Sequence, residues 1–346
     1  MTVRIGVLGA GFIARYHLAM LASARTPHEV VGIHDPDDAK AQALGRELDL
    51  PVLPSEEAVL DAADAVYVCT WTSEHPRLVA AAAAAGRAVF CEKPLAVDLA
   101  AARSMLADVR AAGVVHQVGL VLRDAPAMRL LRSLVHEPSS GPVMGVVFRD
   151  DQYLPVQGVY ASDWRADKAR AGAGTLLEHS IHDLDLLEWV IGPITSVTCR
   201  TEHQHAIDGI EDMAVVLATF AGGGVATLTS VWHDILARPS LRRIEVLCRD
   251  AMITAESDLW GPVRRQRDAG DLDLADDALR DELAARGLRL RNPDDGFLRA
   301  VRDGTVAAPG FEVAVRAHEL LDACYRSAHA GGVPIDVPPA PDEEEP

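Results

Sequence analysis

The chain has 346 residues and a formal net charge of −18. Hydrophobic residues make up 49% and charged residues 24%, which is ordinary for a globular protein, and the length allows two domains. The strong negative charge argues against nucleic acid or an anionic membrane as a partner, because both attract basic surfaces. No apolar run approaches the ~18 residues that a membrane span requires.

The N-terminus and the cysteines bear on the cellular compartment. Met1 runs almost directly into the first apolar segment, which leaves no room for a signal peptide. The five cysteines are scattered without a Cys-x-x-Cys pair, which favours free thiols in a reducing compartment. They are Cys69, Cys91, Cys199, Cys248 and Cys324. We therefore expect a soluble, cytoplasmic protein.

The start of the chain carries the strongest pattern. A strand is predicted over residues 3–8 and a helix over residues 15–24, with Gly9-Ala10-Gly11-Phe12-Ile13-Ala14 between them. Gly-x-Gly-x-x-Ala between a strand and a helix is the dinucleotide-binding fingerprint. Gly9 permits the tight turn, Gly11 lets a pyrophosphate approach the backbone, and the helix N-terminus offers N–H groups to the phosphates. The alternative is an ordinary strand-to-helix turn.

The second predicted strand, residues 29–34, leads directly to Asp35. Its distance from the fingerprint is close to the ~20 residues expected for the carboxylate that binds the adenosine ribose. Asp37 and Asp38 follow without an arginine beside them, so a 2′-phosphate would meet three carboxylates. The sequence therefore predicts NAD rather than NADP as the cofactor. The alternative is that Asp35 only forms a turn before Pro36.

The first third of the chain alternates strands and helices. Strands are predicted over residues 52–53, 65–70, 88–91 and 114–121, and helices over residues 39–48, from 55 onward, 76–85 and 99–112. This order indicates a doubly wound parallel sheet, a Rossmann domain, over residues 1–122. The ligand of such a sheet lies at the carboxyl ends of the strands, where Thr70, Glu92 and Lys93 fall.

The remaining chain predicts an α+β second domain over residues 123–337 with a largely antiparallel sheet. Helices are predicted over residues 127–136 and 311–330, and strands over residues 143–150, 194–201, 213–220, 225–232, 243–247 and 251–255. Residues 264–296 carry many Arg and Asp and are predicted to be a solvated helical excursion; whether it forms a lid is open. Residues 338–346 are predicted to be an acidic disordered tail.

Three further stretches complete a set of motifs. Residues 70–75 read Thr-Trp-Thr-Ser-Glu-His, residues 92–94 read Glu-Lys-Pro, and residues 172–185 read Gly-Ala-Gly-Thr-Leu-Leu-Glu-His-Ser-Ile-His-Asp-Leu-Asp. With the fingerprint and in this order, they resemble the Gfo/Idh/MocA family of NAD(P)-dependent oxidoreductases over nearly the whole chain. The resemblance implies substrates such as sugars, inositols and related polyols. It also implies an oligomer, a homodimer or homotetramer, formed through the open C-terminal sheet.

The resemblance also assigns roles to individual residues. Lys93 of Glu-Lys-Pro falls on the lysine that reaches the substrate hydroxyl, and His182 falls on the catalytic histidine. Asp185 matches the last acid of the family pattern and is expected on the substrate side. The chain departs from that pattern at Ala173, Glu178 and Ser180, where the family has Gly, Asp and Gly. Glu178 keeps the carboxylate, so it either touches the substrate or orients His182.

The same assignment follows from the chemistry of alcohol oxidation. A base must take the hydroxyl proton, and the ordinary pKa of histidine, about 6.5, suits this role. Glu178 and His182 are four residues apart, which would place them on one helix face and let the carboxylate orient the imidazole. Lys93 would donate to the developing alkoxide. The alternatives are a surface lysine and a buried histidine satisfied within the core.

Other residues at the predicted site have weaker support. We predict contact with the cofactor for Gly9, Gly11, Phe12, Ile13, Asp35, Thr70, His75, Glu92, Lys93 and Arg123. Trp164 and Arg165 resemble a substrate-side loop of the family. His75 is as well explained by packing at a helix start ahead of Pro76.

A metal site is the less favoured interpretation of the same motif. His179 and His182 are three residues apart and acidic residues surround them, but His-x-x-His is a loose pattern without a cysteine cluster. We therefore predict no metal.

The sequence thus predicts an NAD-dependent dehydrogenase that acts on a secondary hydroxyl of a small polyhydroxylated substrate. His182 would be the general base, with Glu178 and Lys93 assisting. Two alternatives remain: an enzyme that uses NAD transiently to cleave a glycosidic bond, and a non-catalytic regulator that binds NAD and a sugar.

Overall fold

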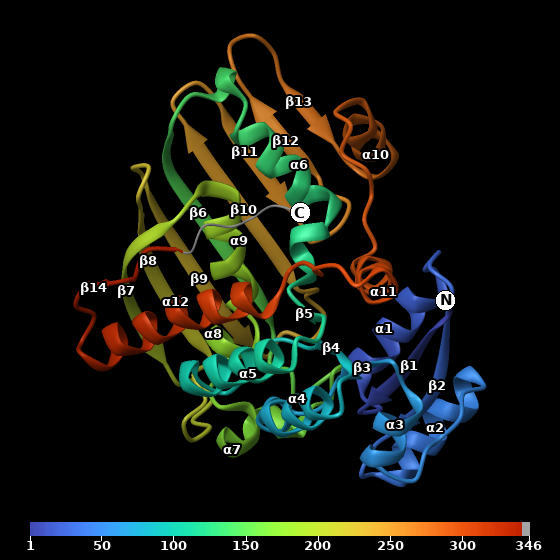
Figure 1. Ribbon diagram of the computed structural model, residues 1–346. Helices are drawn as coiled ribbons and strands as arrows, with labels where there is room; N and C mark the ends of the chain where they lie inside the picture. Colours follow the sequence, from blue (N-terminus) through green and yellow to red (C-terminus); the bar gives the residue numbers. More distant parts are fainter. Residues whose placement is uncertain (341–346) are drawn as a thin grey trace. The chain divides into compact units, whose positions relative to one another are not determined.

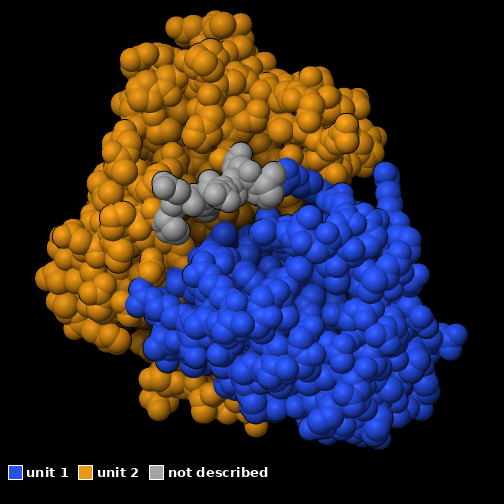
Figure 2. Space-filling view, viewed as in Figure 1, with its two compact units in different colours: residues 1–120, 291–315, 345–346 blue, residues 121–290, 316–344 orange. Residues whose placement is uncertain are grey.

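The computed structural model describes residues 1–340. Within the described residues there are two compact units (Figure 2), one of residues 1–120 and 291–315, the other of residues 121–290 and 316–340. The boundary after residue 120 lies close to the expected one after 122, but residues 291–315 pack with the first unit and so interrupt the stretch 123–337. Of the predicted tail, residues 338–340 have no regular structure, and residues 341–346 lie outside the described part.

Unit 1 contains a five-stranded sheet in the order β2-β1-β3-β4-β5, and its strand pairs are parallel. The strands are β1 (Val3–Leu8), β2 (His28–His34), β3 (Ala65–Val68), β4 (Ala88–Cys91) and β5 (His116–Val118). The helices are α1 (Phe12–Ala22), α2 (Asp38–Leu48), α3 (Glu56–Ala62), α4 (His75–Ala84), α5 (Leu99–Ala112) and α11 (Pro293–Asp303). Reversal of the strand order between β2 and β3 confirms the doubly wound Rossmann topology.

Local signals explain the boundaries in unit 1. The Ser55 side chain accepts from the N–H of Ala58 and so begins α3, and Asp98 does the same for α5. Gly113 ends α5 in the left-handed conformation, as glycine permits. Three predicted strands were too long, and the strand over residues 65–70 ends at Val68. Residues 52–53 contribute a single bridge from Val52 to Ile33, and the strand over 114–121 shrinks to β5.

Unit 2 is built on a nine-stranded sheet in the order β13-β12-β11-β10-β6-β9-β8-β7-β14 (Figure 1). The strands are β6 (Val143–Tyr153), β7 (Ile194–Glu202), β8 (Met213–Phe220), β9 (Val225–His233), β10 (Leu241–Cys248), β11 (Met252–Glu256), β12 (Val263–Gln266), β13 (Leu272–Leu274) and β14 (Ile335–Asp336). The pairs are antiparallel except β6 with β9, which is parallel. The largely antiparallel second sheet is therefore confirmed.

The helices of unit 2 are α6 (Pro126–Val135), α7 (Lys168–Ala171), α8 (Thr175–Glu178), α9 (Ile181–Ile191) and α10 (Asp276–Ala285), and α12 (Phe311–His329) begins in unit 1 and continues into it. Residues alternate along the central strands between buried and exposed, so one sheet face packs against helices and the other is open. The Gly222-Gly223-Gly224 turn joins β8 and β9.

The prediction for residues 264–296 was wrong in part. The stretch includes most of β12 and all of β13, which extend the sheet, and then α10 and the start of α11. The strands pair in register, with Val263 opposite Leu274 and Arg264 opposite Asp273. The alternating charges that looked like a solvated helix are cross-strand neighbours: Arg264 forms an ion pair with Asp273 at 3.1 Å.

Candidate functional site

The glycine loop of unit 1 is shaped by two different constraints. Gly9 has a φ of +100°, and a Cβ there would lie 2.4 Å from the carbonyl oxygen of Cys69, so this position requires glycine. Gly11 caps the N-terminus of α1 with a φ of −82°, and a Cβ there would meet no heavy atom of the described chain within 4 Å. The space above Gly11 is therefore open, next to the N–H groups of the first helical turn. Such a cradle fits the pyrophosphate of a dinucleotide.

Asp35 follows β2 and is fixed against this loop. Its Oδ2 accepts from the N–H of Ala10 at 2.8 Å, and its Oδ1 accepts from the N–H of Asp37 at 2.8 Å. Asp35 does form the turn that was the alternative explanation. Each carboxylate oxygen has a second lone pair, so the turn leaves acceptors for a ribose hydroxyl. The residue that shapes the turn is thus also suited to bind the ribose.

The loops after β3 and β4 are tied together by His75, which is buried. Its Nδ1 lies 3.0 Å from the carbonyl oxygen of Pro94, and its Nε2 lies 3.3 Å from that of Thr70. These contacts support the packing interpretation of His75. Its contact with a cofactor stays a prediction, as does that of Thr70.

Glu92, the first residue of Glu-Lys-Pro, is held by two residues that the sequence did not single out. Its Oε1 lies 2.8 Å from Nε2 of His17 on α1, and Nδ1 of His17 lies 2.8 Å from Oδ1 of Asp294 on α11. Burial alone would lower the pKa of His17, but the hydrogen bonds and charges of Asp294 and Glu92 outweigh it and raise this pKa to about 9. Burial would raise the pKa of Glu92, but His17 and the Lys93 charge hold it below its usual value.

In unit 2, the motif of residues 172–185 does not form one helix. Helix α8 ends at Glu178 and α9 begins at Ile181, because the N–H of Ser180 turns back to the carbonyl of Thr175 at 2.9 Å and the Ser180 hydroxyl donates to Ser230 on β9 at 2.6 Å. Glu178 and His182 therefore lie on different helices, and the expectation of a shared helix face was wrong. Residues 179 and 180 form a turn between the two helices.

Two of the predicted substrate-side residues, Trp164 and Arg165, gather at the end of α8. Arg165 donates from Nε to Oε2 of Glu178 at 3.1 Å, and its guanidinium lies 4.4 Å from the ring centroid of Trp164. Glu178 is 2% exposed and His182 is 9% exposed, in the first turn of α9. The structure thus brings Trp164, Arg165 and Glu178 together next to the break that precedes His182.

Arg123 and Asp185 are paired with each other. Nε of Arg123 lies 3.1 Å and 2.9 Å from the two oxygens of Asp185, and a terminal nitrogen lies 2.7 Å from Oδ1. The sequence had placed Arg123 with the cofactor and Asp185 with the substrate. The Asp185 side chain is 3% exposed, and its bidentate ion pair with Arg123 gives both residues a structural role. Their contacts with cofactor and substrate stay predictions.

A buried cluster of charged side chains joins the sheet to the chain around the turn between α8 and α9. Arg242 on β10 bonds Asp150 on β6 at 2.7 Å and Asp183 on α9 at 2.6 Å, and His179 lies 2.8 Å from the same Asp150 oxygen. Burial raises the pKa of Asp150 and of Asp183, the latter to about 7, although the Arg242 charge opposes this. His179 thus takes part in a charge cluster. Within residues 1–340, no group of three or more His, Cys, Asp or Glu side chains is arranged to hold a metal.

The sequence also missed Glu211, which anchors the start of α8. Its carboxylate accepts from the N–H groups of Gly174 at 2.7 Å and Leu176 at 3.0 Å and from the Tyr325 hydroxyl at 2.9 Å. A Cβ on Gly174 would lie 1.8 Å from the Glu211 carbonyl oxygen, which explains this glycine. The adjacent acids Glu211 and Asp212 before a strand were a visible signal, but nothing local linked them to a motif 37 residues away.

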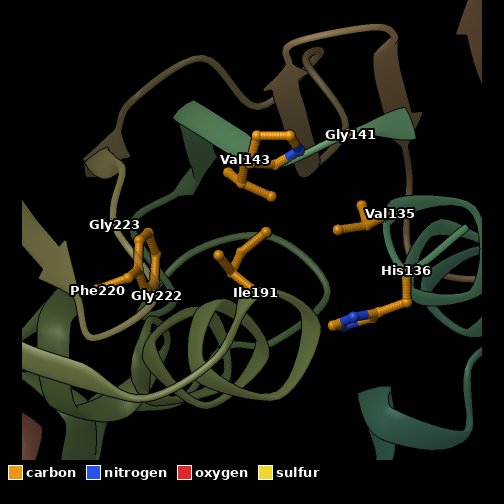
Figure 3. Close-up of a pocket in the computed structure, with 9 residues that line it drawn as sticks. Val135, His136, Gly141, Val143, Ile191, Phe220, Gly222 and Gly223 are labelled. Atoms are coloured by element: carbon orange, nitrogen blue, oxygen red, sulfur yellow. The ribbon is translucent and has the colours of Figure 1, made fainter. Parts of the chain in front are cut away.

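A pocket of about 180 Å³ lies elsewhere in unit 2 (Figure 3). It is lined by Val135, His136, Gly141, Pro142, Val143, Ile191, Phe220, Gly222 and Gly223. Ile191 ends α9, whereas His182 lies in its first turn, so the pocket is at the opposite end of this helix. It does not belong to the candidate site. In the described residues, no helix is long and apolar enough to cross a membrane.

Comparisons with family models match both units. The model described as an oxidoreductase family with an NAD-binding Rossmann fold, GFO/IDH/MocA, matches residues 3–120. The model of the GFO/IDH/MocA C-terminal domain matches residues 128–254.

Individual relatives agree with these matches. The chain is 34% identical to the 1,5-anhydro-D-fructose reductase of Ensifer adhaerens, over 67% of this chain and 68% of that protein. It is 27% identical to the inositol 2-dehydrogenase of Paracoccus denitrificans, over 99% of both chains. The fold matches the crystal structure of the WlbA dehydrogenase from Bordetella pertussis in complex with NADH and UDP-GlcNAcA, with a TM-score of 0.83, 22% identity and coverage of 97% and 98% of the two chains.

Proposed function

The chain belongs to the Gfo/Idh/MocA family of oxidoreductases, and from this premise we propose that it is an NAD-dependent dehydrogenase of a secondary hydroxyl group in a sugar, inositol or related polyol. The reverse reaction, reduction of a ketone, uses the same groups. The observation that carries the proposal is the open space at Gly11, at the start of α1. Asp35 borders this loop, because its carboxylate accepts a hydrogen bond from the N–H of Ala10. The substrate class rests on the names of the relatives, which are reductases or dehydrogenases of anhydrosugars and inositols.

The proposed preference for NAD rests on charge. Asp35 lies at the ribose side of the cradle, and Asp37 and Asp38 begin α2. Lys40 is the nearby cation, and its ammonium lies 3.7 Å from Asp37. Three carboxylates against one exposed lysine leave this edge negative, which disfavours a 2′-phosphate.

The proposed mechanism assigns a proton path to the chain's own residues. Bound NAD supplies the hydride acceptor. His182 takes the hydroxyl proton, and Glu178, itself fixed by Arg165, stabilises the protonated imidazole. Lys93 donates a hydrogen bond to the oxygen as negative charge develops there. Trp164 and Arg165 border the substrate.

The test is NADH absorbance with purified protein, NAD and a panel of inositols, hexoses and sugar acids. We expect one compound class to give NADH, and His182→Ala to lower kcat by at least about a hundredfold while NAD still binds. His203→Ala, an exposed histidine of the same unit, is the matched control and should retain turnover. Turnover in His182→Ala equal to that of the control would contradict the role of His182.

A flat absorbance trace for every compound, with NAD bound, would contradict the net dehydrogenase. The next assay would then look for sugar released by transient oxidation. If neither NADH nor sugar appeared, a regulator that binds NAD and a sugar would be favoured.

We also propose that the protein is a homodimer or homotetramer that assembles through the open face of the unit 2 sheet. Val147, Val215 and Leu217 are exposed on the central strands of this face, with exposed fractions of 50%, 38% and 45%. Val147 on β6 and Leu217 on β8 both lie opposite Thr227 on β9, so they share one row. Apolar side chains in such a row are typical of a surface that is covered in the assembled protein.

A further inference from the structure

We propose that His17 is a positioning residue for Lys93. As an imidazolium between Asp294 and Glu92, it fixes the carboxylate that holds the backbone of Lys93. The role of Lys93 in catalysis rests on the function proposed above, whereas the charge of His17 does not. All four residues belong to unit 1.

The hydrogen-bond geometry sets the protonation state of His17. Both ring nitrogens lie 2.8 Å from a carboxylate oxygen, Nδ1 from Asp294 and Nε2 from Glu92. An ionised carboxylate only accepts hydrogen bonds, so each ring nitrogen must carry a hydrogen. Such a ring is an imidazolium. The site is closed to water, because the side chains of His17, Glu92 and Asp294 are 2%, 7% and 0% exposed.

The charges alternate along a chain of hydrogen bonds that runs from Asp294, which is negative, through His17, which is positive, to Glu92, which is negative. The second oxygen of Glu92 accepts from the backbone N–H of Lys93 at 3.1 Å, so this chain of hydrogen bonds ends on the residue proposed to meet the substrate. Burial would raise the pKa of Glu92, but His17 and Lys93 keep it low, so this carboxylate stays ionised.

The Glu92 side chain also has little freedom to move. A Cβ on Gly119, just after β5, would lie 2.2 Å from Oε1 of Glu92. The carboxylate thus occupies the space that any larger residue at 119 would need. Its orientation is set on one side by the backbone of Gly119 and on the other by His17.

The remaining groups around His17 add no competing charge. The rings of Tyr67 and Phe90 lie 5.6 Å and 4.7 Å from its ring. Burial, and next the charge of Asp294, raises the pKa of Tyr67 well above its usual value, and burial with Glu92 does the same for Cys69. Both groups therefore stay neutral through the working pH range. The surroundings are apolar, which strengthens the ion pairs and makes an unpaired carboxylate costly.

Loss of one proton from His17 would therefore disturb Lys93. A neutral imidazole has a single N–H, so one of the two buried carboxylates would lose its donor. If that carboxylate is Glu92, it loses its hydrogen bond from His17, and its contact with the backbone N–H of Lys93 is no longer fixed. Small displacements of a catalytic group cost up to about a hundredfold in rate.

The experiment combines a titration with kinetics. Ring nitrogens are followed by NMR in protein labelled with ¹⁵N-histidine, and His17→Gln assigns the signal. Asp294→Asn removes one carboxylate while keeping its shape. Asp295→Asn is the matched control, because Asp295 lies in the same helical turn but accepts from the N–H groups of Arg25 and Thr26. NAD affinity and the pH profile of kcat are measured for each protein.

We expect wild-type His17 to stay protonated on both nitrogens at neutral pH and to titrate near 9. Asp294→Asn should lower this midpoint by at least about one pH unit and shift the alkaline limb of kcat in the same direction, with less than about a twofold change in NAD affinity. Asp295→Asn should lower stability without either shift. A wild-type midpoint near the ordinary 6.5 would overturn the imidazolium.

A moved midpoint with an unchanged kcat profile would overturn the positioning role. If no compound gives turnover, the dehydrogenase proposal fails while the titration still decides the charge of His17. The wild-type titration needs no variant besides the assignment, so it remains decisive if Asp294→Asn does not fold.

Discussion

At the scale of single residues, the two glycines of the loop serve different purposes. Gly9 is required by the fold, since its backbone conformation and the nearby Cys69 carbonyl exclude a side chain. Gly11 has an ordinary φ and open space around it, so the fold itself does not demand glycine there. In the function proposed above, the ligand is what excludes a side chain at Gly11, so this position is a direct probe of the proposed cofactor binding.

Gly11→Ala should therefore separate folding from binding. The added methyl group meets no described atom, so the free energy of unfolding without cofactor should change by less than about 1 kcal/mol. The methyl group would stand in the cradle, and we expect the Kd for NAD to rise by at least about tenfold. Urea unfolding and NAD titration measure the two effects. Gly9→Ala is the contrasting variant and should be strongly destabilised; equal stability of the two variants would contradict the assignment.

The pKa of His17 also predicts how stability depends on pH. The folded value, about 9, lies above the ordinary 6.5, so the folded state holds the proton more tightly. This contribution is fully present below pH 6.5, falls as pH rises toward 9 and is lost above it. The raised pKa corresponds to about 3 kcal/mol.

Urea unfolding of the wild type and of His17→Gln at pH 6.5, 8 and 9.5 measures this effect. The stability difference between the two proteins should shrink by roughly that amount as pH rises. A difference that stayed constant with pH would contradict a charged His17.

At the scale of helices and strands, regular patterns were predictable and long-range contacts were not. The sequence predicted α5 and β8 to the residue. In the structure Asp98 caps α5, Gly113 ends it, and burial alternates along β8, and all three are local features. It missed the break between α8 and α9, since that break depends on Ser230, 50 residues away. His17 and Asp294 are 277 residues apart, and no local pattern relates them.

The cluster that joins β6, β10 and α9 gives a prediction at this scale. Arg242 is 5% exposed and contacts both Asp150 and Asp183, so Arg242→Met would remove the cation that the two buried carboxylates share and leave His179 beside Asp150. We expect a loss of about 3–5 kcal/mol in the free energy of unfolding. Adding Asp150→Asn and Asp183→Asn should restore part of it.

Arg243→Met is the matched control for this cluster. Arg243 is the next residue of β10, and its side chain is 42% exposed and pairs with Glu245 and Glu256. Its loss should cost less than about 1 kcal/mol. If urea unfolding gave the same loss in free energy for both variants, burial of Arg242 would not add to its contribution to stability.

At the scale of the whole molecule, each unit is built from two separate segments of the chain. Unit 1 includes α11, which follows most of unit 2 in the sequence. Helix α11 supplies Asp294, which contacts His17. The composition and the order of elements predicted two domains, but they could not show this return of the chain. The open face of the nine-stranded sheet was predictable, since alternation along β8 and β9 leaves one set of side chains outside.

That face leads to the last prediction, which concerns assembly. Val147 and Leu217 lie in one row of the open sheet, flanked by Glu245 and Thr198 on the neighbouring strands. In a symmetric dimer each changed residue occurs twice across the interface, so Val147→Glu with Leu217→Glu would bury four carboxylates at the contact. We expect this double variant to sediment as a monomer at concentrations where the wild type is an oligomer, with little change in the folding of each unit, because both side chains point away from the core.

Val306→Glu is the control for this experiment, since Val306 is 83% exposed and belongs to unit 1. It adds a carboxylate without touching the sheet and should sediment like the wild type. A double variant that kept the wild-type mass would place the contact elsewhere. A wild type that is itself a monomer at every concentration would contradict the proposed assembly altogether, and the apolar row would then need another partner, because about half of each of these side chains faces solvent in the single chain.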